Sequence, residues 1–202
     1  MARPRDENTQ MINRERLLDA GEHAFRKASF SECGINDILS NSGVPKGSFY
    51  HHFTSKEAFG IAVADRYNEA QIAAARACLE DPSLPHIDRV RLFFEQARAD
   101  MGKRQFAQGC LMCNLSTELA DERPAFQAAL DTHWQGMTAV LAKCLDNVEL
   151  SEIRLEHLTP AQAADWLMNA WSGALTRMKA TGSDEPLALF MRTIFKTKEQ
   201  RQ

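Results

Sequence analysis

The spacing of hydrophobic residues along the chain predicts a fold built from helices. Apolar residues recur at intervals of three and four in almost every segment between Arg14 and Lys198. Residues that favour strands never alternate with polar residues for long. The first helix would bury one face from Leu17 to Ala28 and end near 29–31. We therefore expect an all-α protein.

Two short helices with a tight turn between them follow this first helix. The earlier one carries Ile35, Ile38 and Leu39 and is stopped by Asn41-Ser42-Gly43, in which Gly43 suits a left-handed C-terminal cap. The later one places Pro45 at its first helical position and buries Phe49 and Phe53, which lie four residues apart. The pattern is that of a helix-turn-helix, in which the second helix enters the major groove of DNA.

The outer face of the second short helix carries side chains that suit DNA contacts. It offers a cation, hydroxyl groups, an aromatic ring and a small residue, which fit phosphate contacts and the reading of base edges. These candidates are Lys46, Gly47, Ser48, Tyr50 and His51. Residues 1–60 contain equal numbers of basic and acidic side chains, so nonspecific electrostatic attraction to DNA is expected to be weak.

A long helix is predicted to begin at a capping box formed by Thr54 and Glu57. Its apolar face continues for roughly six turns of 3.6 residues, until the proline-containing segment 81–85 ends it. We expect this helix to link two modules. They are a DNA-binding domain over 10–70 and a ligand-sensing and dimerisation domain over 71–202.

The C-terminal part of the chain is predicted to contain a dimer interface. Further helices are expected over 87–101, around 110–119 and after Pro124, and a second capping box joins Thr159 to Gln162. The helix that begins there, and the last helix, carry apolar residues on more than one side, whereas a helix that serves only its own core needs one stripe. We expect a homodimer through the last two helices, about 160–198. Alternatively, both are central helices of a monomer.

The helix-turn-helix region resembles a known family. The resemblance is carried by Gly43-Val44-Pro45-Lys46-Gly47-Ser48-Phe49-Tyr50-His51-His52-Phe53 and by Ser55-Lys56-Glu57-Ala58-Phe59. These runs resemble the signature of the tetracycline-repressor (TetR) family, and the similarity covers about residues 12–67. Downstream it continues only as helical architecture of matching length.

The family resemblance implies a function and the residues that perform it. It implies a homodimeric repressor that leaves a palindromic operator in double-stranded DNA when its C-terminal domain binds or reacts with a small-molecule inducer. Lys46, Gly47, Ser48 and Tyr50 would lie in or beside the groove, with His52 and Lys56 on the phosphates. The family often has threonine at the start of the preceding helix, where this chain has Gly34-Ile35-Asn36; Asn36 would supply the polar side chain there.

Cys110 and Cys113 form the second informative motif. A thioredoxin-like site would need a βαβ unit and a zinc site a second pair of ligands, and the sequence indicates neither. The commonest explanation of such a pair is two small buried residues on a helix. Cys110, however, follows Gly109 at the expected start of a helix, where free N–H groups and the helix dipole favour a thiolate.

The run from Gly109 to Leu119 also resembles one branch of the TetR family, the repressors responsive to acrylate, N-ethylmaleimide and other electrophiles or oxidants. In that branch Cys110 matches the cysteine proposed as sensor, and Lys179 also has a counterpart. A lysine close to Cys110 would lower the pKa of the thiol; alternatively, Lys179 only complements the dipole at a helix C-terminus. Trp134 and Trp171 would line an inducer cavity, with ordinary core packing as the alternative.

Composition and charge exclude several classes of protein. With 202 residues, 44% hydrophobic and 25% charged, the chain has the make-up of an ordinary globular protein rather than a disordered one. Its net charge of −3 gives no bulk attraction to polyanions. Five cysteines are an odd number, which indicates thiols rather than a disulfide framework. No apolar window is long enough to span a membrane, so we expect a cytoplasmic protein.

The sequence indicates no metal site and no cofactor. His51 and His52 are adjacent, so on a helix their side chains point about 100° apart and cannot easily share a metal. We expect a regulator and not an enzyme. The alternative is a thiol-dependent enzyme that uses Cys110 as its nucleophile. Such an enzyme would need a distant His133 or His157 to fold nearby as the base.

Overall fold

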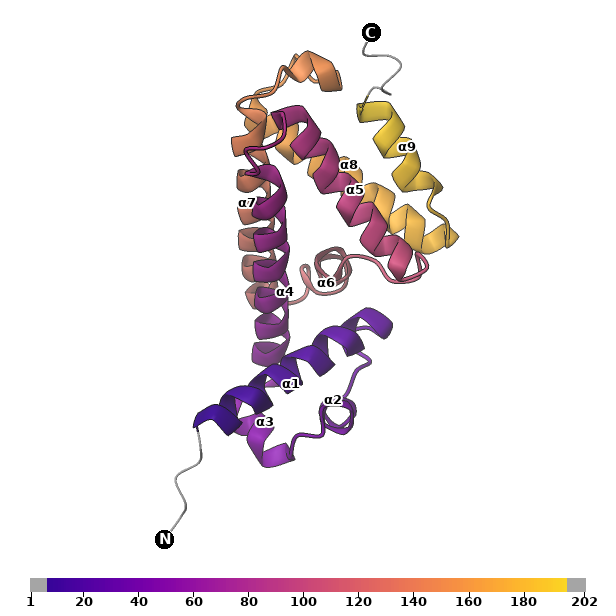
Figure 1. The fold of residues 1–202 in the computed structure, drawn as a ribbon. Coiled ribbons are helices and arrows are strands. Elements are labelled where there is room, and N and C mark those ends of the chain that lie inside the picture. Colours follow the sequence, from indigo (N-terminus) through magenta and orange to yellow (C-terminus); the bar gives the residue numbers. More distant parts are fainter. Residues whose placement is uncertain (1–6, 196–202) are drawn as a thin grey trace.

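The structure is a computed structural model that describes residues 7–195, and the regular secondary structure within this range is entirely helical. The prediction of an all-α fold is confirmed (Figure 1). No helix in the described range is long and apolar enough to cross a membrane. The elements are α1 Glu7–Lys27, α2 Ile35–Ser42, α3 Lys46–His52, α4 Lys56–Leu79, α5 His86–Lys103, α6 Leu111–Leu119, α7 Pro124–Leu145, the 3-10 helix η1 Leu150–Ile153, α8 Pro160–Thr181 and α9 Glu185–Ile194.

The predicted helix-turn-helix is formed by α2 and α3, which lie beside α1 at one end of the molecule (Figure 1). Gly43 ends α2 in the left-handed conformation, with φ of 65°, and its N–H donates to the carbonyl oxygen of Leu39 at 3.0 Å. Phe49 of α3 is fully buried, which fixes the opposite face of α3 toward the outside. Pro45 is the N-cap of α3 and not its first helical residue, so α3 begins one residue later than we predicted.

The predicted start of α4 is wrong by one residue. Ser55, not Thr54, is the N-cap, and its hydroxyl accepts a hydrogen bond from the N–H of Ala58 at 3.0 Å. Ser55 has the extended backbone that a capping residue requires, and Phe59, one turn into the helix, is fully buried. The second predicted capping box is confirmed, because Thr159 accepts from the N–H of Gln162 and donates its own N–H to that side chain.

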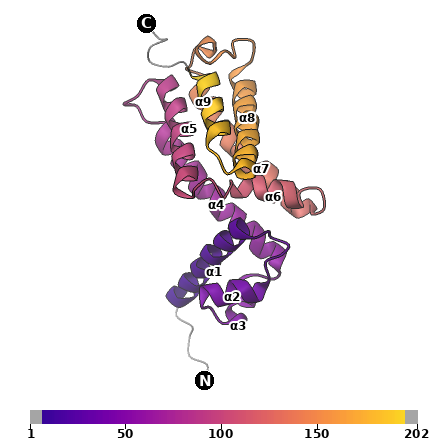
Figure 2. The same cartoon turned by 90° about the vertical axis from the view of Figure 1, so that its right-hand side faces the viewer.

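The long helix α4 runs from the helix-turn-helix into a bundle formed with α5, α7, α8 and α9 (Figures 1 and 2). α4 and α8 both pack along α7, and α9 packs on α8. The ring of Phe94 on α5 lies 5.2 Å from that of Trp171 and 4.9 Å from that of Phe190. These aromatic contacts join three of the helices into one core.

The hydrophobic core is divided into two clusters that meet at α6. Leu111, Leu115 and Leu119 of α6, with Phe126 of α7, belong to the same buried cluster as the side chains of α1 to α3. Figure 2 shows α6 lying across the junction between the N-terminal helices and the bundle. α6 is therefore in direct contact with the N-terminal helices α1 to α3.

Candidate DNA-binding surface and sensor cavity

The outer face of α3 presents four of the eight predicted DNA contacts to solvent. Lys46, Gly47 and His51 are exposed, and Tyr50 keeps half of its surface accessible although it is a large aromatic residue. Ser48 is half-buried on the same short helix. An exposed tyrosine beside a cation is the kind of surface that reads base edges and phosphates.

The remaining DNA-binding candidates are placed less openly. His51 Nε2 lies 3.2 Å from the side-chain oxygen of Gln10 on α1. The pKa of His52 is lowered, first by burial and then by the charges of His51 and Arg14. Asn36 is exposed in the first turn of α2.

Lys56 is held within the protein rather than extended into solvent. Its ammonium group donates to the carbonyl oxygen of Ser31 at 3.3 Å and lies 4.5 Å from the centre of the Phe30 ring. Burial is the main cause of its lowered pKa. In this arrangement Lys56 links the start of α4 to the loop between α1 and α2.

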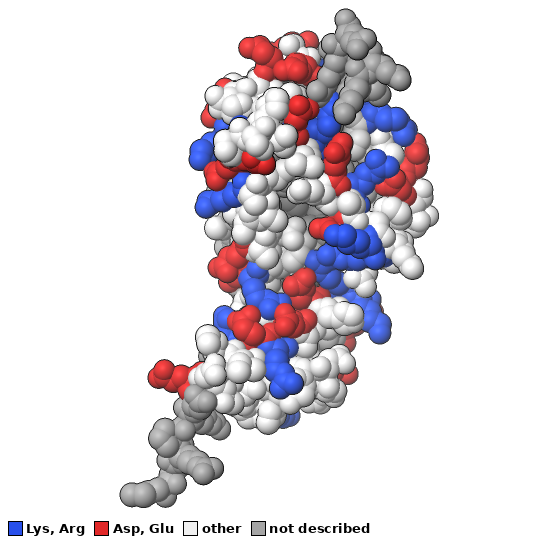
Figure 3. All heavy atoms as spheres, viewed as in Figure 1, with Lys and Arg blue, Asp and Glu red and all other residues white. Residues whose placement is uncertain are grey.

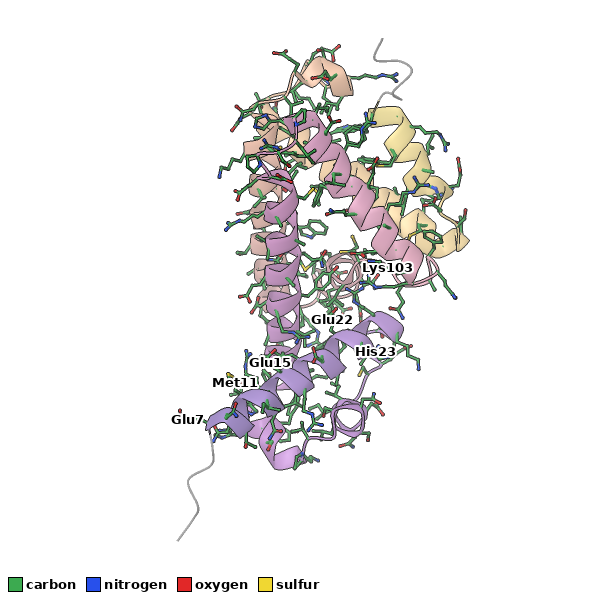
Figure 4. The ribbon with its side chains drawn as sticks, viewed as in Figure 1. Glu7, Met11, Glu15, Glu22, His23 and Lys103 are labelled. Carbon is green, nitrogen blue, oxygen red and sulfur yellow. The ribbon has the colours of Figure 1, made fainter. Side chains whose placement is uncertain are left out.

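On the face that Figure 3 shows, the charged side chains of the described residues do not form a continuous basic surface. Figure 3 shows acidic and basic side chains interspersed over the visible face, as the balanced composition of residues 1–60 suggested. Several of the acidic side chains are engaged with a cation inside the domain. Arg66 of α4 pairs with Asp19 at 2.6 Å, with Glu15 at 3.3 Å and with Glu22 at 3.4 Å; Figure 4 labels Glu15 and Glu22 along α1. These pairs fix the crossing of α1 over α4.

The structure brings three of the four predicted sensor residues together. Cys110, Trp134 and Trp171 line one cavity of about 80 Å³ in the bundle, close to α6. A second compartment of about 70 Å³, which contains Asp100 and Arg104, shares Cys110 and Trp171 as part of its wall. Cys110 therefore stands between a mainly apolar compartment and a more polar one.

The surroundings of Cys110 favour the thiolate form of its side chain. Cys110 is half-buried at the N-cap position of α6, as predicted. A hydrogen bond from Cys113 is the main cause that lowers the pKa of Cys110, to about 6, whereas burial acts to raise this pKa. The N–H groups of Cys113 and Met112 also lower the pKa, as does the hydroxyl of Tyr67, which lies 3.7 Å from the Cys110 sulfur. The pKa of Cys113 is correspondingly raised.

Lys179, the fourth predicted sensor residue, lies beside α6 and forms a hydrogen bond with Asn114 of that helix. Its ammonium group donates to the side-chain oxygen of Asn114 at 3.3 Å, and its Cδ atom would lie 3.7 Å from a Cβ added at Gly109. The groups that act on the Cys110 thiol are its neighbours on α6 and Tyr67. Lys179 therefore supports the segment that contains Cys110.

Sequence reasoning missed two polar contacts, of which the first lies at the cavity. His133 lines it, and Nε2 of His133 lies 2.7 Å from a carboxylate oxygen of Asp65 on α4. The signal in the sequence was a histidine on the apolar stripe of its helix. The acidic partner belongs to a helix 68 positions earlier, so spacing along the chain did not indicate the pair.

The second missed contact joins α6 to the DNA-binding domain. The carboxylate of Glu118, near the end of α6, accepts hydrogen bonds from the N–H groups of Phe30 at 3.0 Å and of Ser31 at 2.7 Å. These two residues lie in the loop that precedes α2. α6 thus has Cys110 at its beginning, and near its end it is hydrogen-bonded to the loop that leads into the helix-turn-helix.

A surface groove of about 360 Å³ lies between α8 and α9. Two large apolar side chains at its edge, Trp166 and Leu189, are 42% and 55% exposed. Gly173 also lines it, and a Cβ added there would meet no heavy atom within 4 Å. Residues 196–198, the end of the dimer segment expected from the sequence, lie outside the described range.

Comparison with known proteins identifies both parts of the chain. Residues 17–63 match the family of bacterial regulatory proteins of the tetR type, and residues 86–194 match the tetracyclin repressor-like C-terminal domain. The HTH-type transcriptional repressor NemR of Escherichia coli is 32% identical over 90% of this chain and 92% of its own length. The transcriptional regulator AcuR of Cereibacter sphaeroides is 34% identical over 95% of this chain and 87% of its own.

Solved structures show the same similarity in three dimensions. The reduced form of Escherichia coli NemR superposes with a TM-score of 0.79 at 32% identity, over 90% of this chain and 95% of that one. A regulatory protein TetR from Rhodobacter sphaeroides has a TM-score of 0.82 at 30% identity, over 89% and 95%. With its helix-turn-helix, its C-terminal bundle and both family matches, the chain belongs to the TetR family of bacterial transcriptional regulators.

Proposed function

We propose that this regulator is a homodimeric repressor that leaves a palindromic operator when a small electrophile or oxidant reacts with Cys110. The observation that carries the proposal is a half-buried thiol, its pKa lowered to about 6, in the wall of a cavity between the two halves of the core. At neutral pH such a thiol is largely thiolate, the reactive form. Two of the relatives are named repressors, NemR and DhaR, the latter from a Mycobacterium species and 33% identical.

A change at Cys110 has a short route to the DNA-binding helices. Cys110 caps the start of α6, and Glu118 near its end holds the N–H groups of Phe30 and Ser31. In a dimer, two recognition helices must fit successive major grooves about 34 Å apart. A small displacement of α6 would change their separation, and the signal acts to the extent that it favours the displaced arrangement.

The proposed dimer forms through α8 and α9. The groove between them, with the exposed Trp166 and Leu189, is an apolar surface of the kind that another chain covers. Open space around Gly173 would let a helix of the partner approach closely. A two-fold axis here would relate the two DNA-binding domains.

The proposal is tested by titrating full-length protein against the DNA that flanks its own gene, at a stated salt concentration. The titration is repeated after treatment with peroxide, acrylate or N-ethylmaleimide, for the wild type and for Cys110→Ser. We expect tight binding that treatment abolishes in the wild type and leaves intact in Cys110→Ser. Cys144→Ser, which alters a buried cysteine with a raised pKa, is the matched control and should respond like the wild type. Binding that ignores every reagent would contradict thiol-based release.

A thiol-dependent enzyme is the second candidate, because His133 lines the same cavity as Cys110. His157, the other histidine considered from the sequence, is exposed in the loop between η1 and α8. Turnover of peroxide with glutathione, lost in both Cys110→Ser and His133→Gln, would support the enzyme. A single stoichiometric reaction at Cys110 without turnover would support the regulator.

A further inference from the structure

His133 on α7 is a buried polar residue with one ring nitrogen unused. The residue is 7% exposed, and Nε2 lies 2.7 Å from Oδ1 of Asp65. Nδ1 is completely buried and has no hydrogen-bond partner among the described residues. A buried polar atom left unpaired destabilises the folded state, because its hydrogen bond to water is lost without replacement. Such an atom in a native core therefore calls for a partner that binds there.

The surroundings of His133 point to a ligand as that partner. His133 lines the same cavity of about 80 Å³ as Cys110, and the lining also includes Trp134 and Trp171. Its other polar lining residues are Tyr67, Asn68, Gln71 and Ser172. Pockets for drug-sized ligands measure about 300–1,000 Å³, so this cavity fits a molecule of only a few heavy atoms. Such a small molecule would lie against the ring of His133. Nδ1 has no open surface in this arrangement, so a bond to it would form once the ring or a neighbouring side chain moves aside.

The hydrogen bond to Asp65 decides what chemistry Nδ1 can offer. A carboxylate only accepts, so Nε2 carries a proton. Nδ1 is then a lone-pair acceptor in the neutral ring, or a second N–H donor in the imidazolium ion. A hydroxyl group suits both forms, because it can either donate or accept, whereas a carboxylate, which only accepts, suits the imidazolium ion. An ether or a halide can only accept, and weakly.

We propose that His133 is the residue that recognises the head group of the inducer, a small, otherwise apolar molecule bearing a hydroxyl or carboxyl group. This inference rests on the proposed function, because it takes the Cys110 cavity as the inducer site. The bond at Nδ1 acts on a ring whose other nitrogen is held by Asp65 of α4, the helix that continues into the DNA-binding domain. His133 therefore sets ligand specificity and ties the ligand to α4.

The test compares two probes of equal shape on full-length protein, 1-butanol and 1-fluorobutane, with butanoate as the acidic probe. Binding is followed by the fluorescence of the two cavity tryptophans. His133→Gln keeps an amide near the position of Nε2 and has no polar atom at that of Nδ1, whereas His133→Asn places an amide near Nδ1. We expect the ratio of the Kd of 1-fluorobutane to that of 1-butanol to fall at least fivefold in His133→Gln and to change less than twofold in His133→Asn. An unchanged ratio in His133→Gln would overturn the inference.

A measurement on the wild type keeps the inference testable if a variant does not fold. The 15N signal of the His133 Nδ1 should move on addition of 1-butanol or butanoate and stay in place with 1-fluorobutane. A signal that no probe moves would mean that a water molecule is the only partner, and the inference would fail.

Operator titrations run in parallel separate this inference from the proposed function. If modification of Cys110 releases DNA while His133→Gln leaves the probe ratio unchanged, the repressor model stands and the role of His133 is rejected. If His133→Gln reduces the ratio while modification leaves DNA binding intact, the recognition role stands and thiol-based release is rejected.

Discussion

At the scale of single residues, the exposed face of α3 makes the most direct prediction about DNA. Lys46→Ala and Tyr50→Ala should each weaken operator binding about tenfold, because each removes one contact to phosphate or base worth about 1–3 kcal/mol. Both side chains are exposed, so folding and dimerisation should be unaffected. For Lys46→Ala, the slope of log K against log salt should also fall in magnitude by about 1. Fluorescence anisotropy with labelled operator measures both quantities. Wild-type affinity in both variants would remove the DNA-binding assignment of α3.

The Cys110 thiol predicts a characteristic pH dependence. With a pKa of about 6, its alkylation by iodoacetamide should rise with pH up to about pH 7 and then level off, because the rate follows the fraction of thiolate. Burial raises the pKa of Cys144 to about 11, so Cys144 should react slowly and its alkylation rate should still be rising at pH 9. Cys113→Ala removes the hydrogen bond that lowers the Cys110 pKa most, so the midpoint should move upward. Mass spectrometry of the Cys110 peptide after timed quenching gives the rates. A midpoint near pH 9 in the wild type would contradict the prediction.

Single residues also show how far the sequence reaches. Cys110 could be predicted as a helix-capping thiol because Gly109 and the following apolar spacing are local signals. Its strongest pKa-lowering contact, with Cys113, is likewise local. The contact between His133 and Asp65 could not be predicted, because it depends on how α4 and α7 are rotated against each other. Periodicity gives the buried face of a helix but not the partner across it.

At the scale of elements, α6 is the helix whose packing partners could not be predicted from the sequence. Division of the chain at residue 70 assigned α6 to the second domain, whereas its leucines are buried with the side chains of the first. Helical spacing shows that Leu111, Leu115 and Leu119 share a face, but it does not indicate against which of the two hydrophobic clusters that face packs. Capping carried a similar uncertainty, since Thr54 and Ser55 are both good N-cap residues and only the burial of Phe59 decides between them.

The link from α6 to the helix-turn-helix predicts the effect of Glu118→Gln. The amide keeps one acceptor oxygen and places an NH2 group against an N–H donor, so one of the two bonds to Phe30 and Ser31 is lost. Unfolding free energy should drop by about 1–2 kcal/mol, as expected for a partly exposed hydrogen bond to a charged group. If α6 transmits the signal, operator release after modification of Cys110 should also be reduced. Urea denaturation and the operator titration measure the two effects.

Glu122→Gln provides the matched control for this prediction. Glu122 is exposed in the turn after α6, so removal of its charge tests the electrostatic effect without the two hydrogen bonds. We expect wild-type stability and release in this variant. Full release in Glu118→Gln, with the same loss of stability, would show that Glu118 supports the fold without transmitting the signal.

At the scale of the whole molecule, the proposed repressor works only as a pair. One chain carries a single recognition helix, α3, at the end opposite to α9 (Figure 1). A palindromic operator is read by two such helices at a fixed separation, so the surface that holds the two chains together determines whether DNA is bound. This surface lies within the segment that the sequence predicts to form the dimer, and Trp166 and Leu189 on it are exposed away from their own core, whereas Leu167, Trp171 and most of the apolar residues behind that prediction are buried.

Leu189→Asp should therefore separate the two chains without unfolding either. The residue is 55% exposed, so the change costs little inside one chain, while in the dimer it would bury two carboxylates near a two-fold axis without a partner. Analytical ultracentrifugation should find a dimer of the wild type and a monomer of Leu189→Asp, with unchanged helical content by circular dichroism. Operator affinity should fall by at least a hundredfold, because each half-site is then bound alone. Met11→Asp changes a comparably exposed apolar residue on α1, labelled in Figure 4, and should remain a dimer. A dimeric Leu189→Asp would place the interface on another face and leave the groove between α8 and α9 without its proposed occupant.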